Sequence, residues 1–410
     1  MTVSKQVASV RDGLRRASRS PVASAAVALP LALVLATCGG GGSGSTGGSG
    51  GSSGGGGLDD IPGSRPERIT LLLEELGNRV VVPRYAAMSR AFTALEEATS
   101  GFCAAPSSAG LGAARAAWRA AIGAWLEASI IQFGPIRDDN RRLRIEFWPD
   151  GNNNVRRSVQ QILARDDALD AATLASQSVA GQGLPALEQL LFEPDADVLA
   201  AFTTEARAPR RCAYATAIAG NLQRIGAAVE SEWRRSEGGW VDQLARAGRG
   251  SDAFPDRDAA VEEVVNSLVT VVEVTKNNRI GDPLGGDAVT EAKPFRAESF
   301  ASGNSLANVV HAVRGLEAVY SGDGGFFGFD DYLRALESLR LNREILDEME
   351  TVVELADAIP APLAGAVQDE MLRPRVVELF DHATTLTRLL KNQLPQVMQV
   401  TVGFNENDGD

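Results

Sequence analysis

The chain has 410 residues and a formal net charge of −13, with 40 Lys and Arg against 53 Asp and Glu. This length suits one large domain or two ordinary ones. Nucleic acid is excluded as an expected partner, because such binding relies on many Lys and Arg contacts to phosphates. An acidic surface attracts cations, although it is more often simply a soluble surface.

Residues 1–37 have the pattern of a secretory signal peptide. Basic residues between Lys5 and Arg19 come first, and an apolar run from Pro21 to Ala36 follows, which is short for a membrane span. The run ends in Leu35-Ala36-Thr37-Cys38, which resembles a bacterial lipobox and predicts lipidation of Cys38. The alternative is an ordinary signal peptide followed by an unmodified cysteine.

Residues 38–57 are predicted to form the lipidated cysteine and a tether. Gly39 to Gly57 contains only Gly, Ser and Thr, so this stretch cannot bury apolar surface and should be flexible. Gly39 replaces the aspartate that retains lipoproteins at the inner membrane. We therefore expect a periplasm-facing protein of the cell envelope, held by a lipid anchor, with the outer membrane favoured.

The rest of the chain has helical periodicity. Ser64-Arg65-Pro66-Glu67 reads as a capping box at the start of a helix, which Pro83 is expected to kink or break. Trp118, Ile122 and Trp125 recur at the spacing of one helix face, in a helix predicted over 111–132. Further helices are predicted over 155–163, 185–192, 209–233, 261–272, 305–320, 330–339, 343–358 and 376–394. No convincing alternating strand pattern occurs, so the predicted class is all-α.

The polar stretch from Gly248 to Asp256 is the best domain boundary. It divides the body into an N-terminal helical bundle (58–248) and a C-terminal helical bundle (249–410), which we expect to pack together. The pair Leu187-Glu188 in the first bundle has a weak counterpart in Leu316-Glu317 of the second bundle. This similarity agrees with two related halves.

The most informative segment is Gly183-Leu184-Pro185-Ala186-Leu187-Glu188. A proline in the first turn of a helix loses no hydrogen bond, and a preceding glycine allows a sharp turn. Glu188 lies one turn after Pro185, where the positive end of the helix dipole favours a carboxylate. Stabilisation of its own helix is the simpler role for Glu188, and ligand binding is the alternative.

Four other segments, together with residues 183–188, form the sequence pattern on which a family resemblance rests. They are Trp118 to Pro135, which includes Trp125 and Glu127; Arg144-Ile145-Glu146-Phe147-Trp148-Pro149-Asp150; Lys276 and Pro283-Leu284-Gly285, with Glu298, Ser302 and Ser305; and Gly403-Phe404-Asn405 with Asp408-Gly409-Asp410. In these segments and their order the chain resembles the imelysin family, in the branch of lipoproteins where proline replaces the histidine of Gly-x-His-x-x-Glu. The resemblance implies two paired helical bundles, a site where they meet, and a role in iron acquisition.

The resemblance also implies which residues contribute to the ligand site. They are Gly183, Pro185, Glu188, Glu127, Arg144, Trp148, Asp150, Glu298, Ser302 and Ser305, with Glu188 as a metal ligand. Simpler roles are open for several of them. Trp118 and Trp125 suit a core, Arg144 and Glu146 suit a surface ion pair on a loop, and Asp150 suits a helix cap. Ser302 and Ser305 suit the start of the helix that follows.

Cys103 and Cys212 remain after the anchor cysteine. In an oxidising periplasm they are expected to pair, and imelysin-like lipoproteins look similar at both places. Two buried thiols or a metal-binding pair are the alternatives. A disulfide here would have a structural role.

Histidine is scarce, since only His311 and His382 occur, and neither has a zinc-protease spacing. The sequence also lacks the Gly-x-Ser-x-Gly elbow of serine hydrolases. Asp408-Gly409-Asp410, with Asn405, offers oxygen ligands for a hard cation but lacks a full calcium loop. These features favour a non-catalytic protein. The resemblance to the imelysin family implies that it binds iron, another divalent cation or a metal-bearing ligand, with an envelope partner in iron uptake. The alternatives are a metallopeptidase and a structural envelope protein.

Overall fold

The computed structural model describes residues 63–193, 197–235 and 237–403. The predicted signal peptide, Cys38, the tether and the Asp408-Gly409-Asp410 motif lie outside these residues. The described residues form helices and loops without strands, which confirms the all-α class. None of the helices in this part of the chain combines the length and apolar character needed to cross a membrane.

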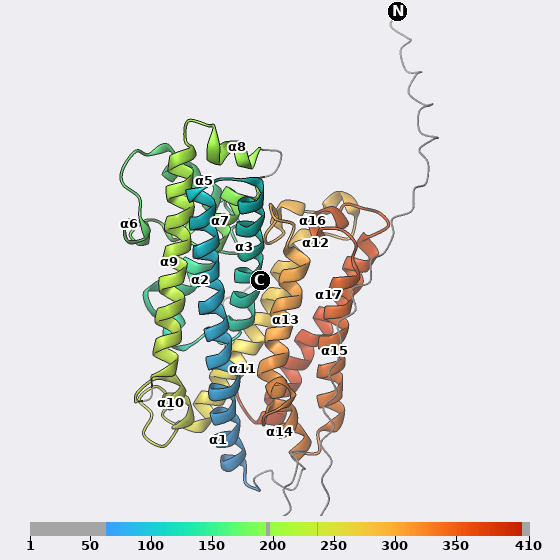
Figure 1. Cartoon of the computed structure of the whole chain (residues 1–410). Coiled ribbons are helices and arrows are strands. Elements are labelled where there is room, and N and C mark those ends of the chain that lie inside the picture. Colours follow the sequence, from blue (N-terminus) through green and yellow to red (C-terminus); the bar gives the residue numbers. More distant parts are fainter. Residues whose placement is uncertain (1–62, 194–196, 236, 404–410) are drawn as a thin grey trace, which may run out of the picture. The chain divides into compact units, whose positions relative to one another are not determined.

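The first group of long helices is α1 (Arg65–Glu75), α2 (Val82–Ala104), α3 (Ser108–Ala128) and α9 (Ala208–Arg234). Helix α2 packs along both α3 and α9 (Figure 1). The predicted face of α3 is buried, since Trp118, Ile122 and Trp125 are each about 1% exposed. Burial of large aromatic side chains is a main source of stability in such a core.

The second group is α11 (Arg257–Val274), α13 (Ser305–Ser321), α15 (Leu339–Ala358) and α17 (Arg373–Arg388). Helix α15 packs against α13 and α17 (Figure 1), and α11 contacts both α13 and α17. The two groups meet chiefly through α3 and α13, and all described residues belong to one compact unit. The Gly248–Asp256 stretch precedes α11, so a division into two domains there stays a prediction.

Shorter helices connect these long ones, and most were not predicted. They are α4 (Arg141–Ile145), α5 (Asn154–Ala164), α6 (Ala171–Ala175), α7 (Leu184–Leu191), α8 (Val198–Thr203), α10 (Trp240–Ala245), α12 (Asp282–Leu284), α14 (Phe329–Ala335), α16 (Leu363–Ala366) and α18 (Leu394–Met398). Helices α5 and α7 match the predicted ranges within two residues.

Helix α1 begins with the predicted capping box, in which Ser64 and Glu67 exchange hydrogen bonds. The expected break at Pro83 is wrong, because the chain stays helical through it. The turn before the proline, Leu76–Val81, is a π-helix, and the Val82 amide donates to the carbonyl five residues back. A wider turn relieves the clash that a proline ring makes with the carbonyl four residues earlier.

A π-helical turn followed by a proline occurs at two more places among the described residues. The π-helical segment Thr275–Gly281 precedes Pro283, and Leu389–Gln393 precedes Pro395. In the first two cases the sequence Asn-Arg-x-x-x-Pro occupies the same place, at Asn78 and at Asn278. This internal repeat supports two related halves.

Helices α3 and α13 approach closely at two glycines. A Cβ at Gly123 would lie 2.6 Å from His311 Nε2, and one at Gly315 would lie 3.0 Å from the Cα of Glu127. Residues 123 and 127 thus face residues 311 and 315 in the same order, so the two helices run in the same direction.

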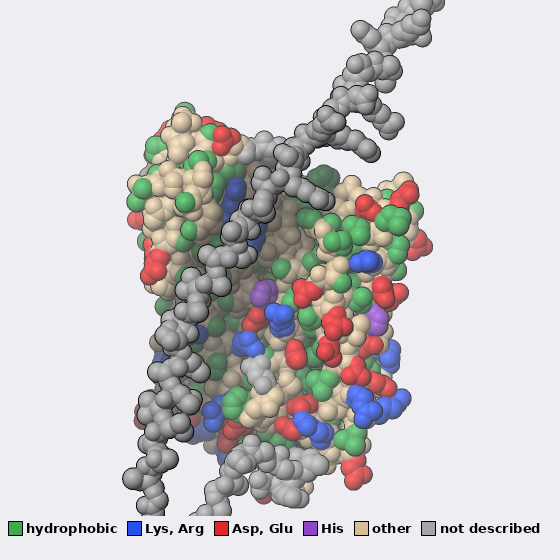
Figure 2. Space-filling model, turned by 45° about the vertical axis from the view of Figure 1, so that its right-hand side comes forward, with side chains coloured by type: hydrophobic (Ala, Val, Ile, Leu, Met, Phe, Trp, Pro, Cys, Tyr) green, Lys and Arg blue, Asp and Glu red, His purple; other side chains and the backbone are tan. Residues whose placement is uncertain are grey.

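Exposed charge does not by itself mark a functional face. Figure 2 shows Asp and Glu side chains intermingled with Lys and Arg over the side that carries α15 and α17. Some of these charges have partners on the same face: Arg340 forms an ion pair with Glu344, and His382 Nδ1 is hydrogen-bonded to Glu348. Exposed pairs of this kind contribute little to stability.

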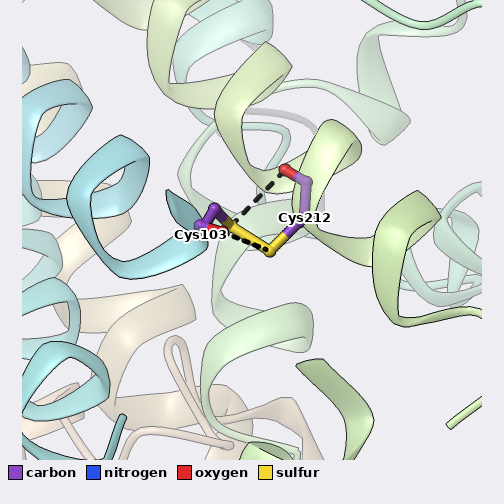
Figure 3. The surroundings of a disulfide bond; sticks show 2 residues. All are labelled: Cys103 and Cys212. Atoms are coloured by element: carbon purple, nitrogen blue, oxygen red, sulfur yellow. Dashed lines mark hydrogen bonds between the residues drawn. A yellow bond between two sulfur atoms is a disulfide. The ribbon is translucent and has the colours of Figure 1, made fainter. Parts of the chain in front are cut away.

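Cys103 and Cys212 form the predicted disulfide (Figure 3). Their Cα atoms are 5.4 Å apart, within the usual range for a bridge. The bond joins the end of α2 to the start of α9, so it holds the two helices together at one end of the pair.

Candidate functional site

Three buried glutamates meet between the two helix groups. We call Glu146, Glu188 and Glu298 the carboxylate cluster; they are 7%, 4% and 2% exposed. Glu146 follows the last residue of α4, Glu188 lies in α7, and Glu298 lies in the loop before α13. Charged side chains are rarely buried together unless partners or a ligand compensate them.

Gly183 fixes the position of α7 relative to the segment that leads to Glu146. Its φ of +88° is unfavourable for any residue with a Cβ. A Cβ there would also overlap the backbone carbonyls of Arg144 and Ile145. The glycine therefore allows the start of α7 to press directly against the end of α4.

Glu188 is held by the loop before α13. The Ser302 amide donates a hydrogen bond to Glu188 Oε1 at 2.8 Å, across the contact between the two helix groups. Burial raises the pKa of Glu188 to about 7, and the charge of Glu298 adds to this, although the bonds from Ser302 oppose it. The carboxyl is therefore close to half protonated near neutral pH.

Glu146 is the most strongly perturbed member of the carboxylate cluster. Trp125 Nε1 donates to Glu146 Oε2 at 2.6 Å. Burial, together with the neighbouring charge of Glu298, raises the pKa of Glu146 to about 8. In its protonated form it can share a hydrogen bond with Glu298.

Glu298 is paired on one side only. Arg279 Nε donates to Glu298 Oε2 at 3.0 Å, and Asn308 Nδ2 donates to the same oxygen at 2.7 Å. Glu298 Oε1 is buried and accepts no hydrogen bond among the described residues. Arg279 lies in the second π-helical segment, and its guanidinium carbon is 5.1 Å from the centre of the Trp148 ring.

Two cavities flank the carboxylate cluster and share a wall of Glu146, Trp148 and Pro149. The first, which we call the acidic cavity, has a volume of about 460 Å³. Its lining includes all three cluster residues together with Asp150, Pro185, Glu193, Asp282, Phe295 and Phe300. The second, which we call the polar cavity, has a volume of about 520 Å³ and includes Trp125, Arg142, Asn266 and Arg279 in its lining.

Most of the predicted site residues converge here. Pro185, Glu188, Trp148, Asp150 and Glu298 line the acidic cavity. Ser302 donates to Glu188, and the Ser305 hydroxyl donates to the Glu298 backbone carbonyl, so both serines hold the cluster rather than cap α13.

Some predicted residues have other roles. Asp150 accepts hydrogen bonds from the Asn154 and Val155 amides, which makes it the expected cap of α5. Arg144 lies on α4 and contributes to neither cavity, and a surface ion pair between it and Glu146 is wrong, because Glu146 is buried.

Glu127 lies outside the lining of both cavities. It pairs with Arg84 and with His311 Nδ1, the latter at 2.8 Å, at the contact of α2, α3 and α13. Burial raises the pKa of Glu127, but the His311 hydrogen bond and the Arg84 charge outweigh this, so its pKa is lowered overall.

Three residues of the site were not identified as site residues from the sequence: Glu146 of the carboxylate cluster, and Arg279 and Asn308, which bind Glu298. Glu146 was expected at the surface, and neither Arg279 nor Asn308 was singled out. The repeated Asn-Arg-x-x-x-Pro motif is the signal that marks Arg279. Among the described residues no three His, Cys, Asp or Glu side chains are arranged to hold a metal ion as they stand.

Comparison with known proteins identifies the family. Residues 81–390 match the imelysin family model, which is more than half of the chain. This chain belongs to the imelysin family. Every residue of the carboxylate cluster lies within the matched range.

Relatives of this imelysin include proteins named for iron. Iron-regulated protein A of Synechococcus elongatus is 27% identical over 248 residues, which cover 60% of this chain and 62% of that protein. The match thus spans less than two thirds of that relative's length.

Solved structures show the same fold. An imelysin-like protein from Psychrobacter arcticum is 25% identical with a TM-score of 0.67, and the match covers 84% of this chain and 99% of that one. A candidate iron-regulated protein A precursor from Parabacteroides distasonis is 16% identical with a TM-score of 0.65, with 83% and 98% covered. The second likeness concerns the fold alone.

Proposed function

We propose that this imelysin is a non-catalytic protein of the cell envelope that binds an iron-bearing ligand in the acidic cavity. The binding would serve iron acquisition. The carboxylate cluster carries the proposal, because three carboxyl groups are buried together at the junction of the two helix groups.

The charge balance of the cluster favours a cation. Arg279 supplies one positive charge directly to Glu298, while the raised pKa values of Glu146 and Glu188 show that these carboxyl groups hold protons where a further counter-charge is absent. Burial of like charges is costly unless a counter-charge is present. Glu298 Oε1 accepts no hydrogen bond among the described residues while Glu146 is ionised, so an incoming cation could take the place of the proton that the two carboxyl groups share. Carboxylate oxygens are ligands that hard cations prefer.

The size of the acidic cavity favours a metal-bearing ligand over a bare ion. About 460 Å³ falls within the range of small-molecule pockets. Trp148, Phe295 and Phe300 supply aromatic walls, and the last two rings are 5.1 Å apart. Such walls suit the organic part of a chelate, while the carboxylates face its positive charge.

The link to iron comes from the relatives. Iron-regulated protein A is named for its regulation by iron, and the resemblance to the imelysin family implies a role in iron acquisition. The envelope location rests on the lipobox-like segment at Cys38. It is tested by feeding cells labelled palmitate: we expect the label on the wild-type chain and none on a Cys38→Ser variant, with labelled wild-type protein found in outer-membrane fractions.

The decisive measurement is elemental analysis of the protein isolated from its native membrane without chelator. We expect iron in the wild-type protein and a rise in its melting temperature when iron is added to the stripped protein. Glu188→Gln and Glu298→Gln should both abolish that rise, because each removes a buried negative charge next to the cavity.

The matched control is Glu354→Gln, which removes an exposed carboxylate of α15 and should leave iron binding intact. If the protein contains no metal, and iron, zinc and calcium all leave its melting temperature unchanged, the proposal is wrong.

A metallopeptidase is the competing function, since the family was named for that activity. It would need a metal-activated water and a base. Cleavage of a peptide library that is lost in Glu188→Gln would establish the enzyme and reject the non-catalytic function.

A further inference from the structure

We propose that the polar cavity is a second ligand site, which binds a small organic acid carrying two or more carboxylate groups. This site is separate from the acidic cavity and does not rest on the iron proposal. The argument starts from one arginine.

Arg142 is a half-buried cation without a partner. It lines the polar cavity, and among the described residues its guanidinium forms no hydrogen bond or ion pair. The neighbouring Arg141 shows the contrast, since it binds both oxygens of Glu232 at 2.9 Å. A guanidinium fork matches the two oxygens of a carboxylate. An unpaired fork at a cavity wall is thus a ready anchor for an anion.

The charge on the lining agrees with an anionic ligand. Arg137, Arg142 and Arg279 face two acidic groups, Glu146 and Glu263. Glu263 is paired with Arg137 at 2.7 Å. Glu146 lies in the wall that the two cavities share and accepts the hydrogen bond of Trp125. Arg279 is paired with Glu298, so Arg142 is the arginine of this lining that no described side chain compensates. The lining of the acidic cavity beyond the shared wall is instead rich in carboxyl groups.

Neutral hydrogen-bonding groups complete the lining. They are Ser129, Gln132, Asn140, Asn266, Ser267 and Thr270. The side-chain oxygen Oδ1 of Asn266 accepts a hydrogen bond from the Gly403 amide at 2.9 Å, and the side-chain NH₂ group has no partner among the described residues. The Ser129 and Thr270 hydroxyl groups donate to helix carbonyls, so they can only accept from a ligand hydroxyl. The side-chain amides of the lining can donate to carboxylate oxygens.

The cavity wall near Arg142 has an unusual backbone. Asp139 and Asn140 are consecutive residues with left-handed conformations, at φ of 51° and 56°. Non-glycine residues in this region carry strain, and such strain concentrates at ligand sites. The volume of about 520 Å³ exceeds what an inorganic anion fills, which favours a multi-atom organic acid.

The test is calorimetric titration of the full protein with citrate, succinate and inorganic phosphate. We expect citrate to bind, and phosphate to bind at least about 10-fold more weakly. Arg142→Gln should weaken citrate binding about 10-fold or more, since a charge-assisted hydrogen bond is lost. Arg142→Lys should weaken it as well, because lysine keeps the charge but loses the fork.

Two controls make the result specific. Arg340→Gln removes an 86% exposed arginine of α15 and should leave citrate binding unchanged. Glu188→Gln should also leave it unchanged while removing the iron response, so the two proposals fail separately. The second site is rejected if neither citrate nor succinate binds, if Arg142→Gln binds citrate as tightly as the wild type while keeping the wild-type melting temperature, or if phosphate binds as well as citrate.

Discussion

Gly183 shows how one residue sets the geometry of the site. Its positive φ and the nearby carbonyls of Arg144 and Ile145 leave no room for a Cβ. We therefore expect Gly183→Ala to lower the free energy of unfolding by at least about 2 kcal/mol. Chemical denaturation of the two proteins measures this directly.

Gly101→Ala is the matched control for this change. Gly101 lies in α2, and no atom lies within 4 Å of the position that an alanine methyl would take, so alanine should be neutral or slightly stabilising. Equal stability of Gly183→Ala and the wild type would contradict the tight contact between α4 and α7.

Only some of the residues in the candidate site could be predicted from the sequence. Glu188 was found because its helix start has a local signature at Gly183 and Pro185. Glu146 and Arg279 were missed because their burial depends on segments more than 100 positions apart. Glu127 was expected in the site but lines neither cavity: it is two positions after Trp125, and two residues of a helix turn a side chain by about 200°.

The contact between α3 and α13 depends on two glycines that let the helices approach. We expect Gly315→Ala to lower the free energy of unfolding by about 1–3 kcal/mol, because its methyl would meet the backbone of Glu127. Thermal melting measures the loss. Gly112→Ala, in an open position of α3, should show no such loss, and a stable Gly315→Ala protein would refute the close packing.

The disulfide acts on the helix pair α2 and α9. It closes a loop of 109 residues, which restricts the unfolded chain. Removal by the double change Cys103→Ala and Cys212→Ala should lower the free energy of unfolding by about 2–4 kcal/mol. Reductant should destabilise the wild type to a similar extent and leave the double variant unaffected. A wild type whose stability does not change with reductant would show that the bond is not formed.

The existence of the helices could be predicted from the sequence more readily than the residues at which they begin and end. The long helices have clear apolar periodicity, so α9 and α13 were predicted within one residue of their observed limits, whereas the limits predicted for α3 are wrong by three and four residues. The effect of Pro83 was not, because a π-helical turn is a response of the packed chain and has no strong local signature. Short helices such as α4 and α6 are fixed by tertiary contacts and were missed for that reason.

At the scale of the whole molecule, the carboxylate cluster makes stability depend on pH. The pKa values of Glu146 and Glu188 are raised from 4.5 to about 8 and about 7. The folded protein therefore binds more protons than the unfolded chain across pH 4.5 to 8, and its stability falls as pH rises through this window.

We accordingly expect the metal-free wild type to melt roughly 2–4 °C lower at about pH 8 than at about pH 5.5. The double variant Glu146→Gln and Glu188→Gln should lose most of this dependence, while Glu354→Gln should keep it. Scanning calorimetry at the two pH values decides the matter, and a wild type that melts higher at the alkaline pH would contradict the raised pKa values.

The π-helical turns before Pro83 and Pro283 have a consequence for how the two halves tolerate change in length. Each wide turn holds one residue more than a regular turn would. Deleting a single residue there would restore ordinary winding and leave the downstream side chains near their present directions, because the wide turn already takes up the extra residue. The same deletion inside a regular turn would rotate all downstream side chains by about 100°. A one-residue deletion at either wide turn should therefore harm the packing less than one elsewhere in a long helix, and its main cost would be the renewed clash of the proline ring with the carbonyl four residues earlier.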